Sequence, residues 1–384
     1  MHGAVVVVGG GVVGASVAYH LAARGVRDVV VLDGAPAPGA GSTGRATGGF
    51  RVQFASAINV RLSLLARERL RAFAEETGGD CGYVPAGYLW IARNEAELTP
   101  LRAALAVQRA NGVGDAREVD AAEVVALNPA LARDGITGGT YCPSDGFIRP
   151  LGILDGYRTA AERLGARFVW EVAVVGARRG AGGRMDALHT TRGDIACDVV
   201  VNAAGAWAGL VGDALGVDVP VVPLRRQVAI TVPTDALPAS MPMTIFADGF
   251  HLRVRDGRVL LLLPTAGADD PFDDAVEPEW IDTVAWAAHA RVPCLRAIPV
   301  DRSNCWAGLY EMSPDGNAIL GPAPGTPNLY LANGSSGHGV MHAPALGLLL
   351  AEMIVDGAAH TLDVTALRAD RFAPTDVACA SELL

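Results

Sequence analysis

The sequence predicts an α/β fold with a Rossmann-like domain and a second α+β domain built on an antiparallel sheet. The chain begins with an apolar strand that contains Val5–Val8, followed by a glycine-rich turn, an apolar helix and a second apolar strand. Residues 328–347 repeat this order of strand, glycines and helix, whereas residues from about 221 to 310 alternate as in an antiparallel sheet. With 384 residues, the chain exceeds the size at which one hydrophobic core stops growing, so two domains are expected.

The composition excludes several classes of partner. Hydrophobic residues make up 51% of the chain, and its net charge of −10 includes no long run of one sign, which disfavours nucleic acid and anionic membrane surfaces. The six cysteines show no C-x-x-C spacing, so free thiols in a reducing compartment are expected. The apolar stretch Leu346–Ala351 is too short to span a bilayer, and no basic segment precedes the first strand. We therefore predict a cytoplasmic protein without a membrane span.

The first strand, turn and helix form a dinucleotide-binding pattern, with Gly9, Gly11 and Gly14 in G-x-G-x-x-G spacing. Gly9 allows the tight turn, Gly11 lets the backbone approach a pyrophosphate, and Gly14 lets the helix pack close to the strand. The helix N-terminus offers free N–H groups and the positive end of its dipole to the phosphates. Asp33 ends the second strand, where a carboxylate accepts a hydrogen bond from an adenosine ribose and disfavours a 2′-phosphate. This unit excludes NADP but leaves NAD and FAD open.

The later elements follow from periodicity and turn residues. Ile58, Leu62, Leu65, Leu70 and Phe73 mark a helix with one buried face. The elements expected after it are a strand pair over 81–93, helices near 94–111 and 119–127, a turn-rich stretch over 138–150, a helix over 151–165, short strands over 166–205, strands over 225–232, 250–254 and 258–264, and a helix near 278–290. The nucleotide-binding domain is predicted to be discontinuous, over 1–80, 145–220 and 311–384, with the second domain over 81–144 and 221–310.

Four motifs occur in a fixed order after the first unit: "GSTGRATGGFRVQF", "VVNAAGAWAG", "WAGLYEMSPDGNAILG" and "NGSSGHGVMHAPALG". Together they resemble the amine-oxidising FAD enzymes of the D-amino-acid oxidase superfamily over almost the whole chain. The closest branch is that of sarcosine oxidase β subunits, dye-linked L-proline dehydrogenase β subunits, and sarcosine and dimethylglycine dehydrogenases. The resemblance covers the family but does not specify the substrate.

The resemblance implies FAD, with its isoalloxazine ring between the two domains. In such proteins the last motif passes beside the flavin, and the next helix points its N-terminus at the ring, where main-chain N–H groups stabilise the anionic reduced form. Some relatives attach FAD through a cysteine at the position of Gly308, so non-covalent FAD is expected here. The predicted cofactor-binding residues are Gly9, Gly11, Val12, Val13, Gly14, Asp33, Gly34, Ser42, Thr43, Arg45, Gly48, Gly49, Val172, Ala203, Ala204, Gly205, Trp207, Gly308, Gly334, Ser336, Gly337, His338, Gly339, Val340 and Met341.

Four residues are candidates for the reaction itself. Arg51 matches a position from which relatives reach the substrate carboxylate, although an arginine that packs structurally is an equal alternative. His338 lies inside the flavin motif and is expected to contact the flavin or the active site. His251 could orient the substrate, against the alternative of a structural histidine in the sheet. Met341 stands where oxygen-using sarcosine oxidases carry a lysine, so oxygen is expected to be a poor electron acceptor.

The predicted reaction is oxidation of the C–N bond of a secondary or tertiary amine or amino acid, such as a sarcosine-, proline- or N-methyl-amino-acid-like compound. A hydride passes to flavin N5, and electrons leave preferentially to a dye, a quinone or an electron-transfer protein. Several alternatives stay open: an oxidase that makes hydrogen peroxide, a subunit active only within a hetero-oligomer, an NAD-dependent dehydrogenase that shares only the first motif, and a non-catalytic flavoprotein. No cluster of metal ligands is visible in the sequence.

Overall fold

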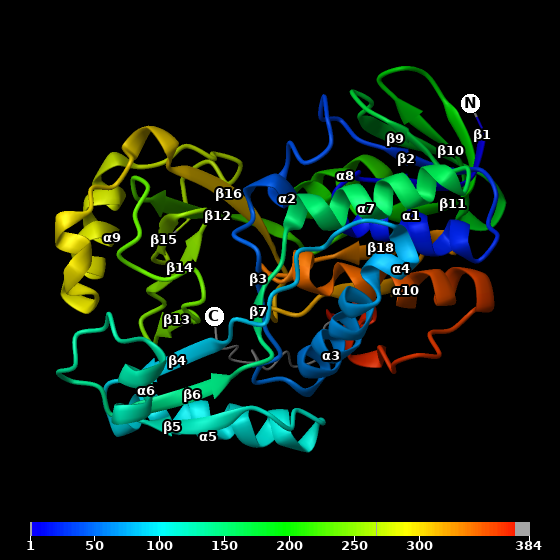
Figure 1. Ribbon diagram of the computed structural model, residues 1–384. Coiled ribbons are helices and arrows are strands. Elements are labelled where there is room, and N and C mark those ends of the chain that lie inside the picture. Colours follow the sequence, from blue (N-terminus) through cyan, green and yellow to red (C-terminus); the bar gives the residue numbers. More distant parts are fainter. Residues whose placement is uncertain (1, 266, 373–384) are drawn as a thin grey trace.

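A computed structural model describes residues 2–265 and 267–372 (Figure 1). Within these residues the chain forms two eight-stranded sheets and one two-stranded sheet. The first large sheet lies with its helices in one half of the molecule, and the second lies in the other half (Figure 1). The predicted α/β fold class, with a Rossmann-like sheet and a second sheet-based domain, is confirmed.

The first sheet has the strand order β17-β18-β11-β1-β2-β8. Its pairs are parallel from β18 to β8, whereas β17 is an antiparallel edge, and β9 and β10 extend β11 as an antiparallel hairpin. Its strands are β1 (His2–Val8), β2 (Val29–Leu32), β8 (Arg167–Val169), β9 (Val174–Arg179), β10 (Met185–Thr190), β11 (Ile195–Asn202), β17 (Ile319–Pro322) and β18 (Leu329–Asn333). The valines of β1 are buried because helices and the hairpin cover both of its faces.

Helices α1 (Val12–Ala23), α7 (Pro150–Arg163) and α10 (Gly339–Asp356) pack together on this sheet. Helix α10 also packs against α3 (Ala57–Arg71), so that the two ends of the chain meet in one core. The other helices are α2 (Ser42–Arg45), α4 (Phe73–Thr77) and α8 (Ala208–Leu215), with 3-10 turns η1 (Ala181–Gly183), η2 (Gly205–Trp207), η5 (Thr365–Leu367) and η6 (Ala369–Phe372).

The second sheet has the strand order β16-β12-β15-β14-β13-β4-β6-β5. Its pairs are antiparallel, as predicted for the second domain, except for β13 and β4, which run parallel. Two hairpin-rich segments far apart in sequence meet there, and no short turn forces them to be antiparallel. The elements are β4 (Tyr88–Ala92), β5 (Arg117–Asp120), β6 (Gly138–Cys142), β12 (Val222–Ile230), β13 (Met243–Phe246), β14 (His251–Arg255), β15 (Arg258–Leu262) and β16 (Trp306–Met312), with helices α5 (Glu95–Ala110), α6 (Ala121–Leu127) and α9 (Pro278–Arg291) and turns η3 (Pro293–Ala297) and η4 (Arg302–Asn304).

The strand content around residues 81–150 differs from the prediction. Only β4 forms in the predicted strand pair over 81–93, because Pro85 and Gly87, at φ 87°, interrupt the chain after Val84, which makes a single bridge to Phe147. The turn-rich stretch over 138–150 contains β6 and β7 (Gly146–Phe147), and β7 pairs with β3 (Gly49–Phe50). Glycines are needed in β6, since a Cβ at Gly139 would lie 1.9 Å from the carbonyl oxygen of Trp90.

The strands of the first large sheet come from the segments predicted for the nucleotide-binding domain, and those of the second come from 81–144 and 221–310. One strand departs from this division, because β16 continues to Met312, two residues past the predicted boundary. The exact boundaries stay a prediction.

Helix α10 is long and apolar enough to cross a membrane by length and composition. The prediction of no membrane span considered only its central stretch Leu346–Ala351, which is shorter than the apolar helix. In the described residues, however, 67% of its apolar window is buried inside the fold, against α1 and α3. It is therefore the core helix of this domain. The five described cysteines are free thiols, and Cys379 lies outside the described residues.

Candidate active site

A cavity lies where the carboxyl ends of the parallel strands face the second sheet. It has two compartments that share Gly11, Ser42, Thr43, Ala203 and Gly205 as walls. The glycine compartment, of about 610 Å³, surrounds the turn after β1 and the end of β2. The sheet compartment, of about 440 Å³, lies between the second sheet and the N-terminus of α10. An elongated ligand would span both.

The three glycines of the first motif have different surroundings. Gly9 has φ 109°, and a Cβ there would lie 2.2 Å from the carbonyl oxygen of Ala203. A Cβ at Gly14 would lie 1.9 Å from the carbonyl oxygen of Gly9, so helix and turn need that glycine for their own packing. A Cβ at Gly11 would meet only the Thr43 hydroxyl, at 3.4 Å. The backbone at Gly11 is therefore left open on the cavity side, as close approach to a phosphate requires.

Helix α1 directs its N-terminus at both compartments. Its N-cap is Gly11, without a side-chain cap and without an acidic residue in the first turn, and the Val12 N–H donates to the Thr43 hydroxyl at 3.1 Å. Asp33 lines the glycine compartment and accepts hydrogen bonds from the N–H groups of Gly10 (2.7 Å) and Ala35 (2.8 Å). A carboxylate oxygen has more than one lone pair, so Asp33 can still accept from a ribose hydroxyl. These groups fit the pyrophosphate and adenosine of FAD.

The cavity contains nearly every predicted cofactor-binding residue, and two do not line it. Gly14 lies behind the turn, and Gly334 lies behind the last motif, where its N–H donates to the Glu311 carboxyl group at 3.1 Å. A Cβ at Gly334 would come within 3.0 Å of the Ser313 Cβ. Packing between chain segments therefore requires both glycines, and their contact with the cofactor stays a prediction.

The last motif forms a strained loop at the N-terminus of α10. Gly337 has φ 90°, and a Cβ there would lie 2.3 Å from the ring of Tyr310, while Ser336 has φ 47°, a conformation rare for a residue other than glycine. His338 is the N-cap of α10 and makes no side-chain capping bond, so the first N–H groups of the helix face the sheet compartment. This supports the predicted role of the glycines, which is to admit a flat ligand to the helix end.

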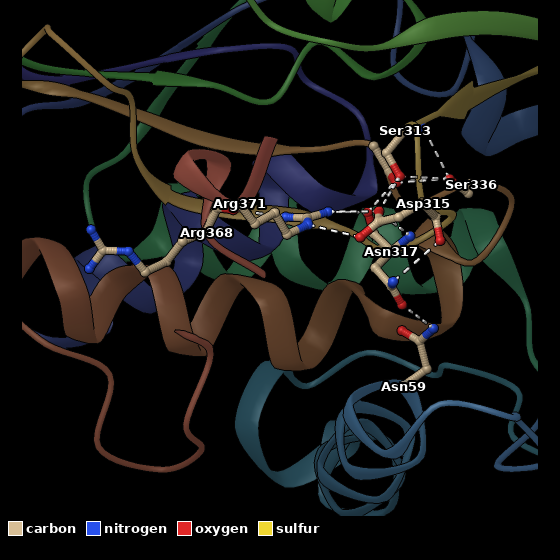
Figure 2. Close-up of polar contacts among 8 residues, drawn as sticks. Asn59, Ser313, Asp315, Asn317, Ser336, Arg368 and Arg371 are labelled. Carbon is tan, nitrogen blue, oxygen red and sulfur yellow. Dashed lines mark hydrogen bonds and ion pairs between the residues drawn. The ribbon is translucent and has the colours of Figure 1, made fainter. Parts of the chain in front are cut away.

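A polar network holds this loop from the side away from the cavity (Figure 2). The Ser336 hydroxyl accepts a hydrogen bond from the Ser313 N–H at 3.1 Å, and the Ser313 hydroxyl donates to the carbonyl of Asn317 at 2.7 Å. Arg371 makes a two-bond contact with Asp315, at 2.9 and 3.0 Å, and also donates to the Asn317 carbonyl at 3.0 Å. This pair holds the pKa of Asp315 below its usual value despite burial. The end of the described chain thus supports the loop that lines the cavity.

The second sheet supplies one wall of the sheet compartment from six strands. This wall is mostly apolar, with valine, leucine, isoleucine, methionine and tryptophan side chains, and its polar members are few. The residues are Tyr88 and Trp90 of β4, Met243 and Ile245 of β13, His251 of β14, Leu262 of β15, Arg226, Gln227 and Val228 of β12, and Gly308 and Tyr310 of β16. Such a wall excludes water and strengthens the few polar contacts inside.

Two histidines face this compartment as neutral rings. The Nδ1 atom of His251 lies 2.8 Å from the carbonyl oxygen of Gly249 and must donate to it, which leaves Nε2 as an acceptor toward the cavity. Burial, with Arg51 and Arg226 nearby, lowers the pKa of His251 to about 4. His338 Nε2 lies 3.1 Å from Arg51, whose guanidinium can only donate, so that nitrogen is the acceptor.

Arg51 lines the sheet compartment, is 4% exposed and places its guanidinium 5.3 Å from the ring of Trp90. Its guanidinium stacks on Phe54 at 3.9 Å and donates to the carbonyl of Gln53 at 2.5 Å. Behind it, the buried carboxyl of Asp145 accepts from the Val52 N–H at 2.7 Å, and burial raises the pKa of Asp145 to about 7. The predicted position of Arg51 beside the flavin motif agrees with this geometry.

Met341 of α10 lines the same compartment, is 7% exposed and belongs to the hydrophobic core in which α10 packs. The chain contains no lysine at all, so its basic side chains other than histidine are arginines. Gly308 faces the cavity against Arg45, whose Cβ lies 2.9 Å from where a Gly308 Cβ would be. Cys305 points elsewhere and donates to the carbonyl of Asp301 at 3.4 Å, and no cysteine among the described residues lines either compartment.

Three polar residues of the cavity were missed as candidates from the sequence. Glu311 follows Tyr310 in the "GLYEMSPDG" motif, and burial raises the pKa of its carboxyl group to about 7. Arg226 and Trp90 belong to strands whose facing side only the assembled sheet reveals. The glutamate could have been noticed as one of two acids within that motif, with Asp315, whereas no local signal marked the other two. Among the described residues, no group of three potential metal ligands occurs.

Comparison with known proteins places this geometry in a family. Residues 4–353 match the DAO family, described as FAD dependent oxidoreductase. The chain is 30% identical to glycine oxidase of Geobacillus kaustophilus, over 91% of this chain and 92% of that protein. It is 31% identical to mitochondrial dimethylglycine dehydrogenase of Rattus norvegicus, over 92% of this chain but only 43% of that longer protein. The crystal structure of L-proline dehydrogenase from P. horikoshii superposes with a TM-score of 0.89 at 28% identity, covering 97% of this chain and 98% of the other.

The match spans most of the chain, and the cavity supplies an uncapped helix N-terminus, an open glycine and a ribose-binding acid in the arrangement that the cofactor needs. The resemblance inferred from the four motifs is therefore confirmed. The chain belongs to the DAO family of FAD-dependent oxidoreductases.

Proposed function

We propose that this protein oxidises the C–N bond of a secondary or tertiary amine that carries a carboxylate, and passes the electrons preferentially to an acceptor other than oxygen. The observation that carries the proposal is the sheet compartment, where Arg51 and neutral His251 face a mostly apolar cavity beside the N-terminus of α10. The names of the relatives support the substrate class, since they specify glycine, dimethylglycine and L-proline.

Each side chain has a defined task in this proposal. The bound flavin supplies the two-electron oxidation. Arg51 binds the carboxylate with its planar guanidinium, and the His251 Nε2 lone pair accepts a hydrogen bond from the amine. Because the pKa of His251 is lowered to about 4, the ring stays neutral near pH 7 and does not repel a positively charged amine. The apolar wall excludes water from the reacting bond.

The test of this function is an anaerobic screen of amines against the purified yellow protein, with loss of flavin absorbance as the measurement. Sarcosine, L-proline, dimethylglycine and N-methyl amino acids form the test set, and the corresponding amines without a carboxylate form the control. We expect bleaching by a member of the test set and none by its control. If no carboxylate-bearing amine reduces the flavin, the proposal fails.

The preference for a non-oxygen acceptor rests on Met341, since an uncharged thioether cannot stabilise developing superoxide. We predict that Met341→Lys raises the rate at which oxygen reoxidises the reduced enzyme by about tenfold or more, provided that burial does not strip the lysine of its charge. Stopped-flow reoxidation measures this rate. Because the chain has no other lysine, acetylation of the variant then targets that amine and the N-terminus alone and should reverse the gain.

An oxidase that forms hydrogen peroxide is a second candidate, and one contact favours it. Arg51 brings a cation to His338, at the end of α10 where the flavin is expected. Fast reoxidation of the wild-type enzyme by oxygen would establish this candidate and reject the dehydrogenase. Peroxide yield per substrate oxidised gives an independent measurement.

Non-covalent binding of FAD is part of the proposal, because Gly308 offers no thiol and no described cysteine lines the cavity. The flavin should therefore appear in the supernatant after acid denaturation, and flavin retained on the precipitated chain would contradict this. The cytoplasmic location and the partner subunit stay predictions.

A further inference from the structure

Arg226 is a second arginine in the sheet compartment, and its role is not explained by the proposed reaction. It lies on β12 and faces the cavity, where it donates to the carbonyl groups of Thr265 at 3.2 Å and Arg225 at 3.4 Å. No carboxylate among the described residues pairs with it. Burial lowers the pKa of Arg226.

The neighbouring residue shows how this sheet treats an arginine that serves packing. Arg225 lies on the other face of β12 and is paired with two acids, Asp273 at 2.6 Å and Glu277. Its charge is therefore compensated within the protein. Arg226, one residue later, is half-buried and has only neutral oxygens as hydrogen-bond partners among the described residues. The contrast between the two arginines indicates that the charge of Arg226 is available to bind a ligand.

The groups around Arg226 are suited to an anion. Tyr310 is its diagonal neighbour across β12 and β16, with the guanidinium 5.6 Å from the ring. The indole Nε1 of Trp90, a buried donor on the same wall, has no hydrogen-bond partner within the described residues. The acid that lines this compartment in the described chain is Glu311, whose pKa of about 7 leaves much of it protonated. The wall thus offers donors and positive charge with little competing negative charge.

Arg51 and Arg226 reach the compartment from different segments of the chain. Arg51 follows β3, which pairs with β7 outside the second sheet, while Arg226 belongs to that sheet. The positive charges of both arginines lower the pKa of the His251 ring. A substrate with one carboxylate at Arg51 would leave Arg226 uncompensated.

We propose that Arg226 is a second anion-binding residue, and that the substrate is an amine with two carboxylates, one bound by Arg51 and the other by Arg226. A secondary amine such as an N-carboxymethyl amino acid has this chemistry. The inference rests on the proposed amine oxidation for its reaction, but the binding site for a dicarboxylate does not depend on it. Arg226 therefore determines specificity.

The first experiment needs no turnover. The FAD-bound protein is titrated with malonate and with acetate, neither of which contains an amine, and the shift of the flavin spectrum gives each Kd. We expect malonate to bind about tenfold or more tightly than acetate, since charge-assisted pairs in a dry site are strong. The variant Arg226→Gln should lose that difference, and Arg226→Lys should retain part of it.

The matched control is Arg255→Gln. Arg255 is also a sheet arginine with a pKa lowered by burial, it stacks on Trp306 at 5.0 Å, and it does not line the compartment. This control should keep the wild-type preference for malonate. Equal malonate affinity in wild type and Arg226→Gln would overturn the proposal.

The second experiment compares turnover of iminodiacetate, with two carboxylates, and sarcosine, with one. Arg226→Gln should lower kcat/KM for iminodiacetate by about tenfold to a hundredfold while changing sarcosine by less than about threefold. An equal loss on both substrates would show that Arg226 supports the site in general, and would overturn the proposal. If no amine reduces the flavin, the proposed function fails, and the malonate titration still decides the role of Arg226.

Discussion

The two compartments of the cavity are built in different ways. The glycine compartment is lined mainly by the turn after β1 and the segment after β2, which are close in sequence and rich in glycine and alanine, with residues 172–174 and 203–211 beside them. The sheet compartment is made of side chains from six strands, the Arg51 loop and the start of α10, which span residues 45–341. The glycine compartment offers main-chain N–H groups that no side chain covers. The properties of the sheet compartment depend instead on the identity of individual side chains.

This difference explains why one compartment specifies the cofactor and the other the substrate. Phosphate recognition by a helix N-terminus requires only a bare turn and a free helix end, so relatives with different substrates can share it. Under the proposed function, discrimination among amines depends on where Arg51, Arg226 and His251 lie, and single substitutions would change it. The predictions below test whether the two compartments can be disabled separately.

The largest effect is expected from a pair of glycine substitutions in the glycine compartment. Gly14→Ala places a Cβ 1.9 Å from the Gly9 carbonyl oxygen, so α1 cannot pack and the free energy of unfolding should fall by roughly 3 kcal/mol or more. Gly11→Ala meets only Thr43 at 3.4 Å, so the fold should persist while FAD affinity falls. Urea unfolding and flavin content measure the two outcomes. Similar stability of the two variants would contradict the distinction.

In the sheet compartment, Arg51→Ala should lower kcat/KM by roughly 2–5 kcal/mol, with a much smaller change in FAD affinity, because a charge-assisted pair to the carboxylate is lost. Arg51 also donates to Gln53 and contacts His338, so Arg51→Lys, which keeps a charge, is the matched control and should recover part of the activity. Steady-state kinetics with an artificial dye provide the measurement. Activity of Arg51→Ala within about twofold of wild type would exclude Arg51 as the carboxylate-binding residue.

Glu311 gives the sheet compartment a dependence on pH. Its pKa is about 7 in the folded protein against an ordinary value of 4.5, so the folded state holds a proton that the unfolded state releases between these values. Stability should therefore fall as pH rises through this window. Relative to Glu311→Gln, the wild type should lose on the order of 2 kcal/mol between pH 5 and 8, as measured by urea unfolding. A constant difference between the two proteins across this range would refute the shift.

The smallest effect is expected from the network behind the flavin loop (Figure 2). Arg371→Ala removes the two-bond contact to Asp315 and should weaken FAD binding by roughly 1 kcal/mol, because Ser336 and Gly316 lose support. The control is Arg368→Ala, whose partner Asp370 lies on the surface and outside the network. FAD titration of the apoproteins measures both. Equal affinities would show that the loop does not need Arg371.

The sequence alone determined the fold class, the cofactor and most of the glycine compartment. Glycine spacing, the valines of β1 and the acid after β2 are local features, and each has one physical reason to occur in that order. The resemblance also named Arg51, His338 and Met341 as candidates for the reaction, and all three line the sheet compartment. These features can be recognised in the sequence because binding by main-chain N–H groups requires residues without side chains at positions that are close together in the chain.

Only the tertiary structure decided which side chains of the second sheet face the substrate. Arg225 and Arg226 are adjacent and chemically identical, yet one is paired with two acids and the other faces the cavity. Alternation along a strand places neighbours on opposite faces, but which face meets the cavity depends on how β12 pairs with β15 and β16. The parallel junction of β13 and β4, which brings Trp90 to the same wall, likewise joins segments about 150 residues apart that no local pattern could pair.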